Sequence, residues 1–288
     1  MSDEQTSPSG QRLAKVMARA GLCSRREAET WIEAGRVEVN GQLQTSPAFN
    51  VTEADKVAVD GKPLPEAEPP RLFRFHKPAG YVVSASDELG RLTVFDLLPD
   101  SLPRLQAVGR LDINTEGLLL LTNDGELKRR LELPSTGWLR RYRVRAYGRI
   151  DQAALDRLKQ GVTVEGVNYG PIEANLDRGD GANVWMTLGL REGKNREIRK
   201  VLEHLGLKVN RLLRISYGPF LLGDIPKRGI LEVPRSQLRD QLGIGPQVKD
   251  RTGFAKAKPK PVKPGRRKVR RQETPKEGEP RADRRRKP

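Results

Sequence analysis

Residues 109–127, GRLDINTEGLLLLTNDGEL, place a carboxylate, Asp112, shortly before an uninterrupted aliphatic run. The run, Leu118–Leu121, is short and is bounded by turn-forming residues, which is typical of one buried strand. We therefore expect Asp112 on the loop that leads into a core strand. Loops held by a rigid scaffold often carry catalytic residues. Asp112 is the first candidate catalytic residue, although an aspartate in such a loop can also simply cap backbone N–H groups.

The positive charge of the chain is concentrated near its C-terminus. Residues 249–288 hold 17 Lys and Arg against 5 Asp and Glu, a net charge of +12 out of +17 for all 288 residues. The segment contains one aromatic residue, so it cannot bury enough apolar surface to fold, and we expect it to be disordered. A cationic arm without a lipidation motif or an amphipathic face favours binding to nucleic acid over binding to a membrane.

Cysteine content and apolar segments indicate the compartment. Cys23 is the only cysteine, so no intrachain disulfide can form, and a reducing compartment is expected. The first ten residues lack the basic and apolar pattern of a secretory signal, and no apolar run approaches the length of a membrane span. We expect a cytoplasmic protein that does not bind membranes.

The N-terminal segment, residues 11–62, is expected to form a compact unit of two helices and a small sheet. Apolar residues recur at i, i+3, i+4 and i+7 over residues 11–20 and predict the first helix. Ser24 followed by Glu27 is a capping-box pattern that predicts the start of the second helix. Asn40-Gly41 follows a short alternating valine segment and predicts a hairpin turn.

This segment resembles an S4 RNA-binding domain, most clearly in AGLCSRRE (residues 20–27) and GRVEVNG (residues 35–41). The resemblance implies that cations on its turns and exposed helix faces contact phosphates of folded RNA. The candidate RNA-binding residues are Arg12, Lys15, Ser24, Arg25, Arg26 and Arg36. A solvated helical face with incidental arginines is the alternative interpretation.

Residues 71–245 are predicted to form an α+β domain with a largely antiparallel mixed sheet, because many strand-like segments accompany few helices. The expected strands are residues 72–77, 118–121, 141–147, 184–190, 209–215 and 229–233. Three helices are expected: a short one that ends near residue 131, and two that span residues 151–160 and 195–205. A proline-rich linker, residues 63–70, precedes this domain, and residues 1–10 and 246–288 are expected to be disordered.

Common cofactor and metal motifs do not occur in the sequence. Two histidines and one cysteine cannot form a recognisable zinc site, and no GxSxG nucleophile elbow is present. The Gly193-Lys194 pair lacks the earlier glycine of a phosphate-binding loop. We therefore expect chemistry that needs neither a metal nor a cofactor.

The stretch quoted first is similar to the central motif of the pseudouridine synthases, in the G-R-L-D form of the RsuA/RluB group. The resemblance implies that Asp112 is the catalytic residue, as a nucleophile or as a general base. It also implies that Arg110 fills the gap left by a flipped uridine, and that Tyr142, in the strand RYRVRAY, stacks on the base. For Tyr142, a tyrosine that merely faces the core is the alternative.

A third motif, REGKNREIR, ends at Arg199 and resembles the late motif of the same family. The resemblance implies that Arg199 pairs with the carboxylate of Asp112 and that Ile198, beside it, belongs to the substrate site. Lys194 and Arg196, near the expected helix start, would then face phosphate. An exposed run of helical charges is the alternative interpretation.

Together the motifs imply a ribosomal RNA pseudouridine synthase that converts one uridine to pseudouridine without a cofactor. Ribosomal RNA or a precursor particle would be its partner, with no obligate protein partner and a monomeric state. Within the group, the basic extension favours the subgroup that acts on large-subunit RNA.

Two other functions need to be considered. A non-catalytic S4-type ribosome-assembly factor fits the charge distribution equally well, but it has no need of Arg110, Asp112, Tyr142 and Arg199 together. A glycosidase that uses Asp112 and Glu116 as paired acids is disfavoured, because Gly117 and the surrounding turn residues argue against the helix that would put both on one face.

Overall fold

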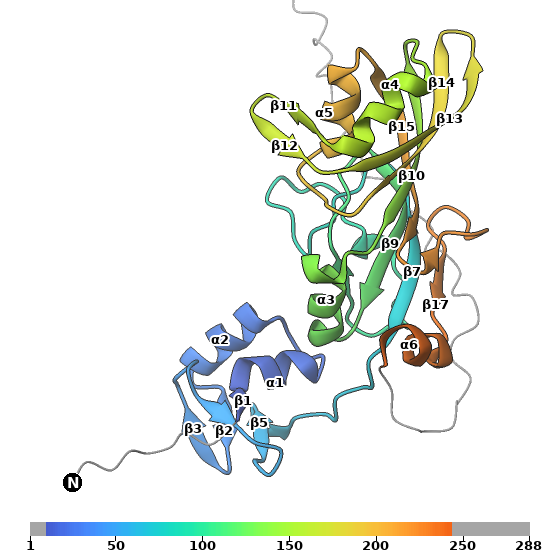
Figure 1. Ribbon diagram of the computed structural model, residues 1–288. Coiled ribbons are helices and arrows are strands. Elements are labelled where there is room, and N and C mark those ends of the chain that lie inside the picture. The colour runs from blue at the N-terminus through green and yellow to red at the C-terminus, as the bar shows by residue number, and fades with distance from the viewer. Residues whose placement is uncertain (1–9, 244–288) are drawn as a thin grey trace, which may run out of the picture.

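The computed structural model describes residues 10–243, which form a smaller N-terminal unit and a larger unit built on one wide sheet (Figure 1). The ends that the sequence predicts to be disordered, residues 1–10 and 246–288, lie outside the described residues except for Gly10. Within the described range, every helix is too short or too polar to cross a membrane.

The smaller unit has the predicted combination of two helices and a small sheet. Its elements are β1 (Gln11–Arg12), α1 (Leu13–Arg19), α2 (Arg25–Glu33), β2 (Val37–Val39), β3 (Gln42–Gln44), β4 (Asn50–Val51), β5 (Val57–Val59) and β6 (Lys62–Pro63). Strands β3, β2, β5 and β6 form an antiparallel sheet in that order, and β1 pairs with β4. The helices and the sheet share an apolar core that includes Leu13, Met17 and Ile32.

Local sequence signals in this unit are confirmed. The Ser24 hydroxyl accepts the N–H of Glu27 at 3.1 Å, and the N–H of Ser24 donates to the Glu27 carboxylate at 2.6 Å, which completes the capping box. Asn40 and Gly41 have φ angles of 54° and 78°, the left-handed pair that a tight hairpin turn requires between β2 and β3.

The larger unit contains a sheet of nine strands. The sheet is mixed and largely antiparallel, as the sequence predicts. Seven strands follow the order β13-β14-β10-β15-β9-β7-β17, with β16 paired to β15 and β8 paired to β9. Its strands are β7 (Leu72–Lys77), β8 (Gln106–Val108), β9 (Thr115–Thr122), β10 (Arg140–Tyr147), β13 (Ile172–Asp180), β14 (Asn183–Leu190), β15 (Lys208–Tyr217), β16 (Phe220–Leu221) and β17 (Ile230–Glu232). The pair β15–β9 is parallel and the other pairs are antiparallel. A separate hairpin joins β11 (Val162–Val164) and β12 (Val167–Tyr169).

Strand β9 is the buried strand expected from the aliphatic run, and it is longer than the run. All eight of its residues are buried. A Cβ atom at Gly117 would lie 2.3 Å from the carbonyl oxygen of Arg214, so only glycine allows β15 to lie this close at the start of β9. The loop that carries Asp112 is thereby attached to the centre of the sheet.

Side chains alternate along β9 between two apolar cores, one on each face of the sheet. Leu119 and Leu121 belong to one core, whereas Leu118 and Leu120 belong to the other. The first core includes residues of α4 (Gln152–Asp156) and α5 (Glu197–His204), and the second includes residues of α3 (Gly125–Glu132) and α6 (Arg235–Leu242). Helix α6 was not predicted from the sequence, and its Leu238 and Leu242 complete the second core.

The smaller unit lies next to α3 of the larger unit (Figure 1). Lys15 pairs with Glu126 at 2.6 Å, and Arg104 pairs with Glu27 at 3.0 Å. These side chains are partly or largely exposed, so each pair contributes little to stability. Residues 64–71 connect the units without regular secondary structure.

Candidate active site

Asp112 lies on the loop between β8 and β9. The N–H of Thr115 donates to the Asp112 carbonyl at 3.0 Å, and the N–H of Gly80 donates to the Ile113 carbonyl at 2.8 Å. Both bonds join backbone groups and restrict the loop at two points. The carboxylate of Asp112 therefore projects from a backbone segment with little freedom.

A fully buried lysine lies beneath this loop. Lys77, the last residue of β7, is 0 % exposed, and its Nζ donates to the carbonyls of Pro78 (3.0 Å), Ile113 (3.2 Å) and Thr115 (2.8 Å). Burial lowers the pKa of Lys77 to about 8, and the nearby charge of Asp112 opposes that shift. Sequence reasoning missed this residue, because a lysine before a proline at a strand end gives no sign of burial.

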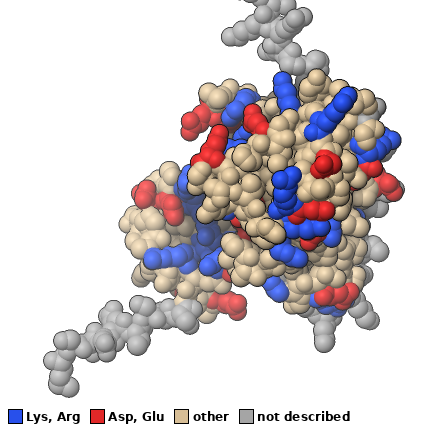
Figure 2. All heavy atoms as spheres, turned by 45° about the horizontal axis from the view of Figure 1, so that its top comes forward, with Lys and Arg blue, Asp and Glu red and all other residues tan. Residues whose placement is uncertain are grey.

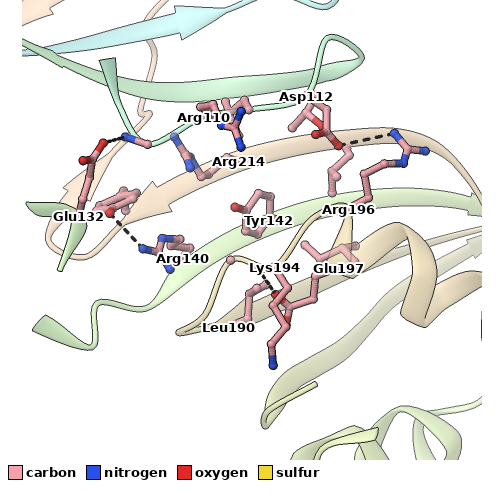
Figure 3. Close-up of a pocket in the computed structure, with 17 residues that line it drawn as sticks. Arg110, Asp112, Glu132, Arg140, Tyr142, Leu190, Lys194, Arg196, Glu197 and Arg214 are labelled. Atoms are coloured by element: carbon pink, nitrogen blue, oxygen red, sulfur yellow. Dashed lines mark hydrogen bonds and ion pairs between the residues drawn. The ribbon is translucent and has the colours of Figure 1, made fainter. Parts of the chain in front are cut away.

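A pocket of about 320 Å³ opens beside Asp112 (Figure 3). Its charged lining residues come from several elements that are far apart in the sequence. The cationic ones are Arg110, Arg140, Lys194, Arg196 and Arg214, and the acidic ones are Asp112, Glu132 and Glu197. Cations outnumber acids, so the pocket is suited to an anionic ligand.

Arg196 makes the ion pair with Asp112, at 3.6 Å between Nη1 and Oδ2 (Figure 3). Arg196 precedes α5 and has a left-handed backbone conformation, with φ 50°. This conformation is uncommon for a residue other than glycine. The turn directs the guanidinium toward Asp112, whereas the family resemblance implies that Arg196 faces phosphate.

Arg199 makes no ion pair of 4.0 Å or less with the Asp112 carboxylate, contrary to expectation, although the two charges still interact at longer range. The Arg199 guanidinium donates to the carbonyls of Val209 (3.2 Å) and Asn114 (3.3 Å). Arg199 lies in the first turn of α5 and reaches the backbone two residues beyond Asp112. It fastens the loop to α5 and β15 and does not line the pocket.

Tyr142 lies in the middle of the pocket, between the Asp112–Arg196 pair and Arg140 (Figure 3). It is 8 % exposed and continues the buried face of β10, followed by Val144 and Ala146. Both interpretations of this tyrosine therefore describe its position: it packs against the core and its ring also borders the pocket.

The side chains of the remaining residues of the third motif have different positions relative to the pocket. Ile198 lines the pocket, as does Arg110 from the first motif. Lys194 also lines it, but its Nζ pairs with Glu192 at 2.8 Å and donates to the Asn168 carbonyl at 2.5 Å. In Figure 3 that nitrogen points away from Asp112, so Lys194 is not presented as a free phosphate ligand.

A buried carboxyl group, which the sequence reasoning also missed, holds the loop that carries Arg196. Glu197 is 3 % exposed; one carboxylate oxygen accepts the N–H of Lys194 at 2.9 Å, and the carboxyl group also shares a hydrogen bond with the side chain of Glu192. Burial raises the pKa of Glu197 to about 7, and the charge of Glu192 adds to the shift. The local signal for this contact is the spacing of three residues between Lys194, in the loop, and Glu197, whose carboxylate accepts its N–H.

Two further arginines of the pocket were not predicted as site residues. The guanidinium carbon Cζ of Arg140 lies 4.8 Å from the centre of the Tyr217 ring, and that of Arg214 lies 5.2 Å from it. The alternation Leu212, Arg214, Ser216 along β15 places Arg214 on the buried face, and this period-2 pattern could have identified it. Arg140 carries no comparable signal in a strand rich in arginine.

The predicted RNA-binding residues of the smaller unit have different roles. Arg12 donates to the Ala48 carbonyl and Lys15 pairs with Glu126, whereas Ser24 caps α2. Arg36 pairs with Asp60 at 2.5 Å and lies over the ring of Trp31.

Arg25 and Arg26 have no ion-pair partner within residues 10–243, so they remain the most available cations of the predicted set. Figure 2 shows Lys and Arg side chains gathered in the recess where the smaller unit meets the larger one. Nowhere in the described part of the chain do three or more His, Cys, Asp or Glu residues form a group that could hold a metal ion.

Comparison with protein families matches two parts of the chain. An S4 domain model matches residues 11–57, and a model described as RNA pseudouridylate synthase matches residues 71–204. These ranges cover most of the smaller unit and most of the wide sheet, including Asp112 and Arg199.

Curated relatives and solved structures agree with the family match. An uncharacterized RNA pseudouridine synthase of Rickettsia felis is 44% identical over 223 residues, covering 77% of this chain and 96% of the relative. The ribosomal large subunit pseudouridine synthase B of Haemophilus influenzae is 40% identical over 270 residues, covering 90% of this chain and 76% of the relative. A crystal structure of a pseudouridylate synthase aligns with TM-score 0.56 and 25% identity, covering 80% of this chain and 98% of that one.

Proposed function

Because the chain belongs to the RNA pseudouridylate synthase family, we propose that it converts one uridine of large-subunit ribosomal RNA to pseudouridine, with Asp112 initiating the reaction. The observation that carries this proposal is the Asp112–Arg196 pair at the edge of a cationic pocket that also contains Tyr142. That the chain is an RNA pseudouridine synthase follows from the family; the ribosomal target and the residue roles are our proposal.

The reaction needs little from the protein beyond positioning and one carboxylate. The bond between N1 of uracil and C1′ of ribose breaks, the base turns, and a bond forms between C5 and C1′. The proton leaves C5 and N1 gains one, so atoms and electrons balance without an external reagent. Asp112 can begin this sequence by attack on carbon or by removal of a sugar proton.

The other pocket residues act on the position of the nucleotide. The target uridine must leave its stack before Asp112 can reach it, and the ring of Tyr142 offers a surface on which the base can stack. Arg196 orients the carboxylate, and the loop attached to Lys77 keeps that carboxylate at a fixed position relative to Tyr142. Arg110 also lines the pocket, beside Gly109, and is suited to fill the space that the flipped uridine leaves in the RNA stack.

The large-subunit target is supported by the name of the Haemophilus influenzae relative, which the chain matches over most of its length. We propose that the units divide as an S4 domain over residues 11–62 and a catalytic domain over residues 71–245. The S4 domain and the basic C-terminal segment would provide affinity for ribosomal RNA or a precursor particle in the cytoplasm. A purely RNA-binding role is not favoured, because it leaves the pocket and its ion pair without a use.

The test is to map pseudouridine in ribosomal RNA from cells that lack the protein. We expect one large-subunit position to be lost, restored by the wild-type gene and not by Asp112→Asn. A complete pseudouridine map in the deleted strain would refute the ribosomal target, and restoration by Asp112→Asn would refute the role of Asp112.

A further inference from the structure

The pocket has a second charged region, at a distance from the Asp112–Arg196 pair (Figure 3). Arg140 from β10 and Arg214 from β15 both line the pocket and both contact the ring of Tyr217. Arg140 also donates to the Tyr217 hydroxyl at 3.1 Å and to the Arg191 carbonyl at 2.7 Å. Tyr217 in turn donates to the Leu131 carbonyl at 2.8 Å, so its ring is a fixed support for both guanidinium groups.

Arg214 is the more unusual of the two, because it is 2 % exposed. Its Nε donates to the Leu118 carbonyl at 2.7 Å, but its Nη2 is buried and has no hydrogen-bond partner within the described residues. Arg214 is the cross-strand partner of Tyr142, so the two side chains emerge on the same face of the sheet. Its unused N–H groups are therefore next to the place proposed for the uracil ring.

Neither arginine has a carboxylate to balance its charge. Within residues 10–243 no ion pair of 4.0 Å or less involves Arg140 or Arg214. Glu132, an acidic residue that also lines the pocket, accepts the N–H of Gly109 at 2.6 Å and pairs with Lys128. For Arg214, which is buried, a charge without a partner is costly. Such an arrangement is explained when a ligand supplies the missing negative charge.

We propose that Arg140 and Arg214 form a subsite for one phosphodiester of the RNA strand, adjacent to the target uridine. This inference rests on the function proposed above. Two guanidinium groups that converge on one cavity match the several acceptor oxygens and the charge of a phosphate better than they match a neutral base carbonyl. The nucleotide is then held at its phosphate by this subsite and at its sugar and base by Asp112 and Tyr142.

Single neutral linkages in the RNA test the proposal directly. The substrate is a synthetic fragment around the uridine identified by the cellular mapping, with a methylphosphonate replacing one phosphodiester at a time on either side of that uridine. For the wild-type enzyme we expect one linkage at which the replacement weakens binding about 10- to 100-fold, the range of a lost charge-assisted hydrogen bond. The other linkages should have smaller effects.

The same RNA series is measured with Arg140→Gln and Arg214→Gln. Each variant should bind unmodified RNA about 10- to 100-fold more weakly, and the sensitive methylphosphonate should cost it little more, because the contact is already lost. The slope of log affinity against log salt should become shallower by about one for each variant. Arg140 is the less buried residue, so its variant keeps the test valid if Arg214→Gln fails to fold.

Arg74→Gln is the matched control. Arg74 also lies on a strand of the sheet and donates to a backbone carbonyl, that of Leu221 at 3.0 Å, but it does not line the pocket. It should keep wild-type affinity and wild-type sensitivity to the methylphosphonate.

The subsite would be overturned if the methylphosphonate weakened RNA binding by the Arg140 and Arg214 variants as much as it weakens binding by the wild-type enzyme, so that the two losses of affinity add. It would also be overturned if no neutral linkage weakened binding by the wild-type enzyme. If the wild-type enzyme does not convert the unmodified fragment, the proposed function itself fails, and that result is distinct from additive losses in an active enzyme.

Discussion

Two loops bring Asp112 and Arg196 together, and they are held by different chemistry. The loop of Asp112 is fixed by backbone hydrogen bonds and by Lys77, which is buried beneath it. The loop of Arg196 is fixed by carboxyl groups: Glu197 accepts the N–H of Lys194, and Glu192 accepts the N–H of Gly170 and pairs with the Lys194 side chain. The loop of Asp112 is thus held by backbone groups and a buried cation whose pKa is about 8, whereas the loop of Arg196 is held by carboxyl groups, one of which has a pKa of about 7.

Removal of the buried lysine should have the largest effect on the first loop. Lys77→Met leaves three carbonyls without their donor, so we expect a loss of about 1–3 kcal/mol in the free energy of unfolding. The single-turnover rate should fall about 100-fold or more, because Asp112 is no longer held in place. Urea denaturation and tritium release from C5-labelled RNA measure the two quantities. Lys208→Met, at an exposed end of β15, is the control; a Lys77 variant as active as this control would show that the loop is held without Lys77.

The roles of Arg196 and Arg199, which the family resemblance assigns differently from the structure, can be separated next. Arg196→Gln should lower the single-turnover rate about 10- to 100-fold with little change in melting temperature, because it removes only a partly exposed partner of Asp112. Arg199→Gln should lower both, because it removes two bonds to the backbone. Rates and melting curves measured on the same samples decide the matter. Loss of rate only in Arg199→Gln, with stability unchanged, would restore the original expectation for that residue.

The second loop should respond to pH through Glu197. Its pKa is about 7 when folded and 4.5 in the unfolded chain, so between these values the unfolded state has released a proton that the folded state retains. Stability should therefore fall as pH rises from about 5 to 7, by at most about 1.4 kcal/mol per pH unit.

Activity should also decline above pH 7, as ionised Glu197 is repelled by Glu192 and the Arg196 loop loosens. Glu197→Gln should lack both trends below about pH 7.5, before Lys77 begins to lose its proton, and unfolding in urea with rates at pH 5–7.5 measures them. A Gln variant with the wild-type pH profile would show that Glu197 does not control this loop.

The smallest effect on the chemical step is expected from the basic C-terminal segment, which belongs to neither loop. Deletion of residues 249–288 removes a net charge of +12, so RNA affinity should fall and its salt dependence should become shallower. The single-turnover rate at saturating RNA should stay within about twofold of wild type. Affinity across a salt series, together with that rate, separates the effects; a rate loss that saturation cannot restore would give the segment a part in the chemistry.

The same contrast explains how far sequence reasoning reaches into this protein. The strand after Asp112, the capping box at Ser24 and the hairpin at Asn40 follow from short local patterns, and the structure contains all three. Lys77 does not follow from such a pattern, because its burial arises from a strand that is distant in the sequence. Arg214 does follow from one, the alternation along β15, but that alternation does not show that the residue borders a pocket. The choice between Arg196 and Arg199 depends on one left-handed residue before α5, which spacing along a helix does not reveal.

The central claim is that the Asp112 carboxylate begins the isomerisation. Asp112→Asn keeps the size of the side chain and removes its ability to act as nucleophile or base. The direct measurement is tritium release from C5-labelled uridine in a ribosomal RNA fragment at saturating enzyme, alongside RNA affinity and melting temperature. The account predicts no detectable release with affinity and stability close to wild type. Release at near the wild-type rate would contradict it.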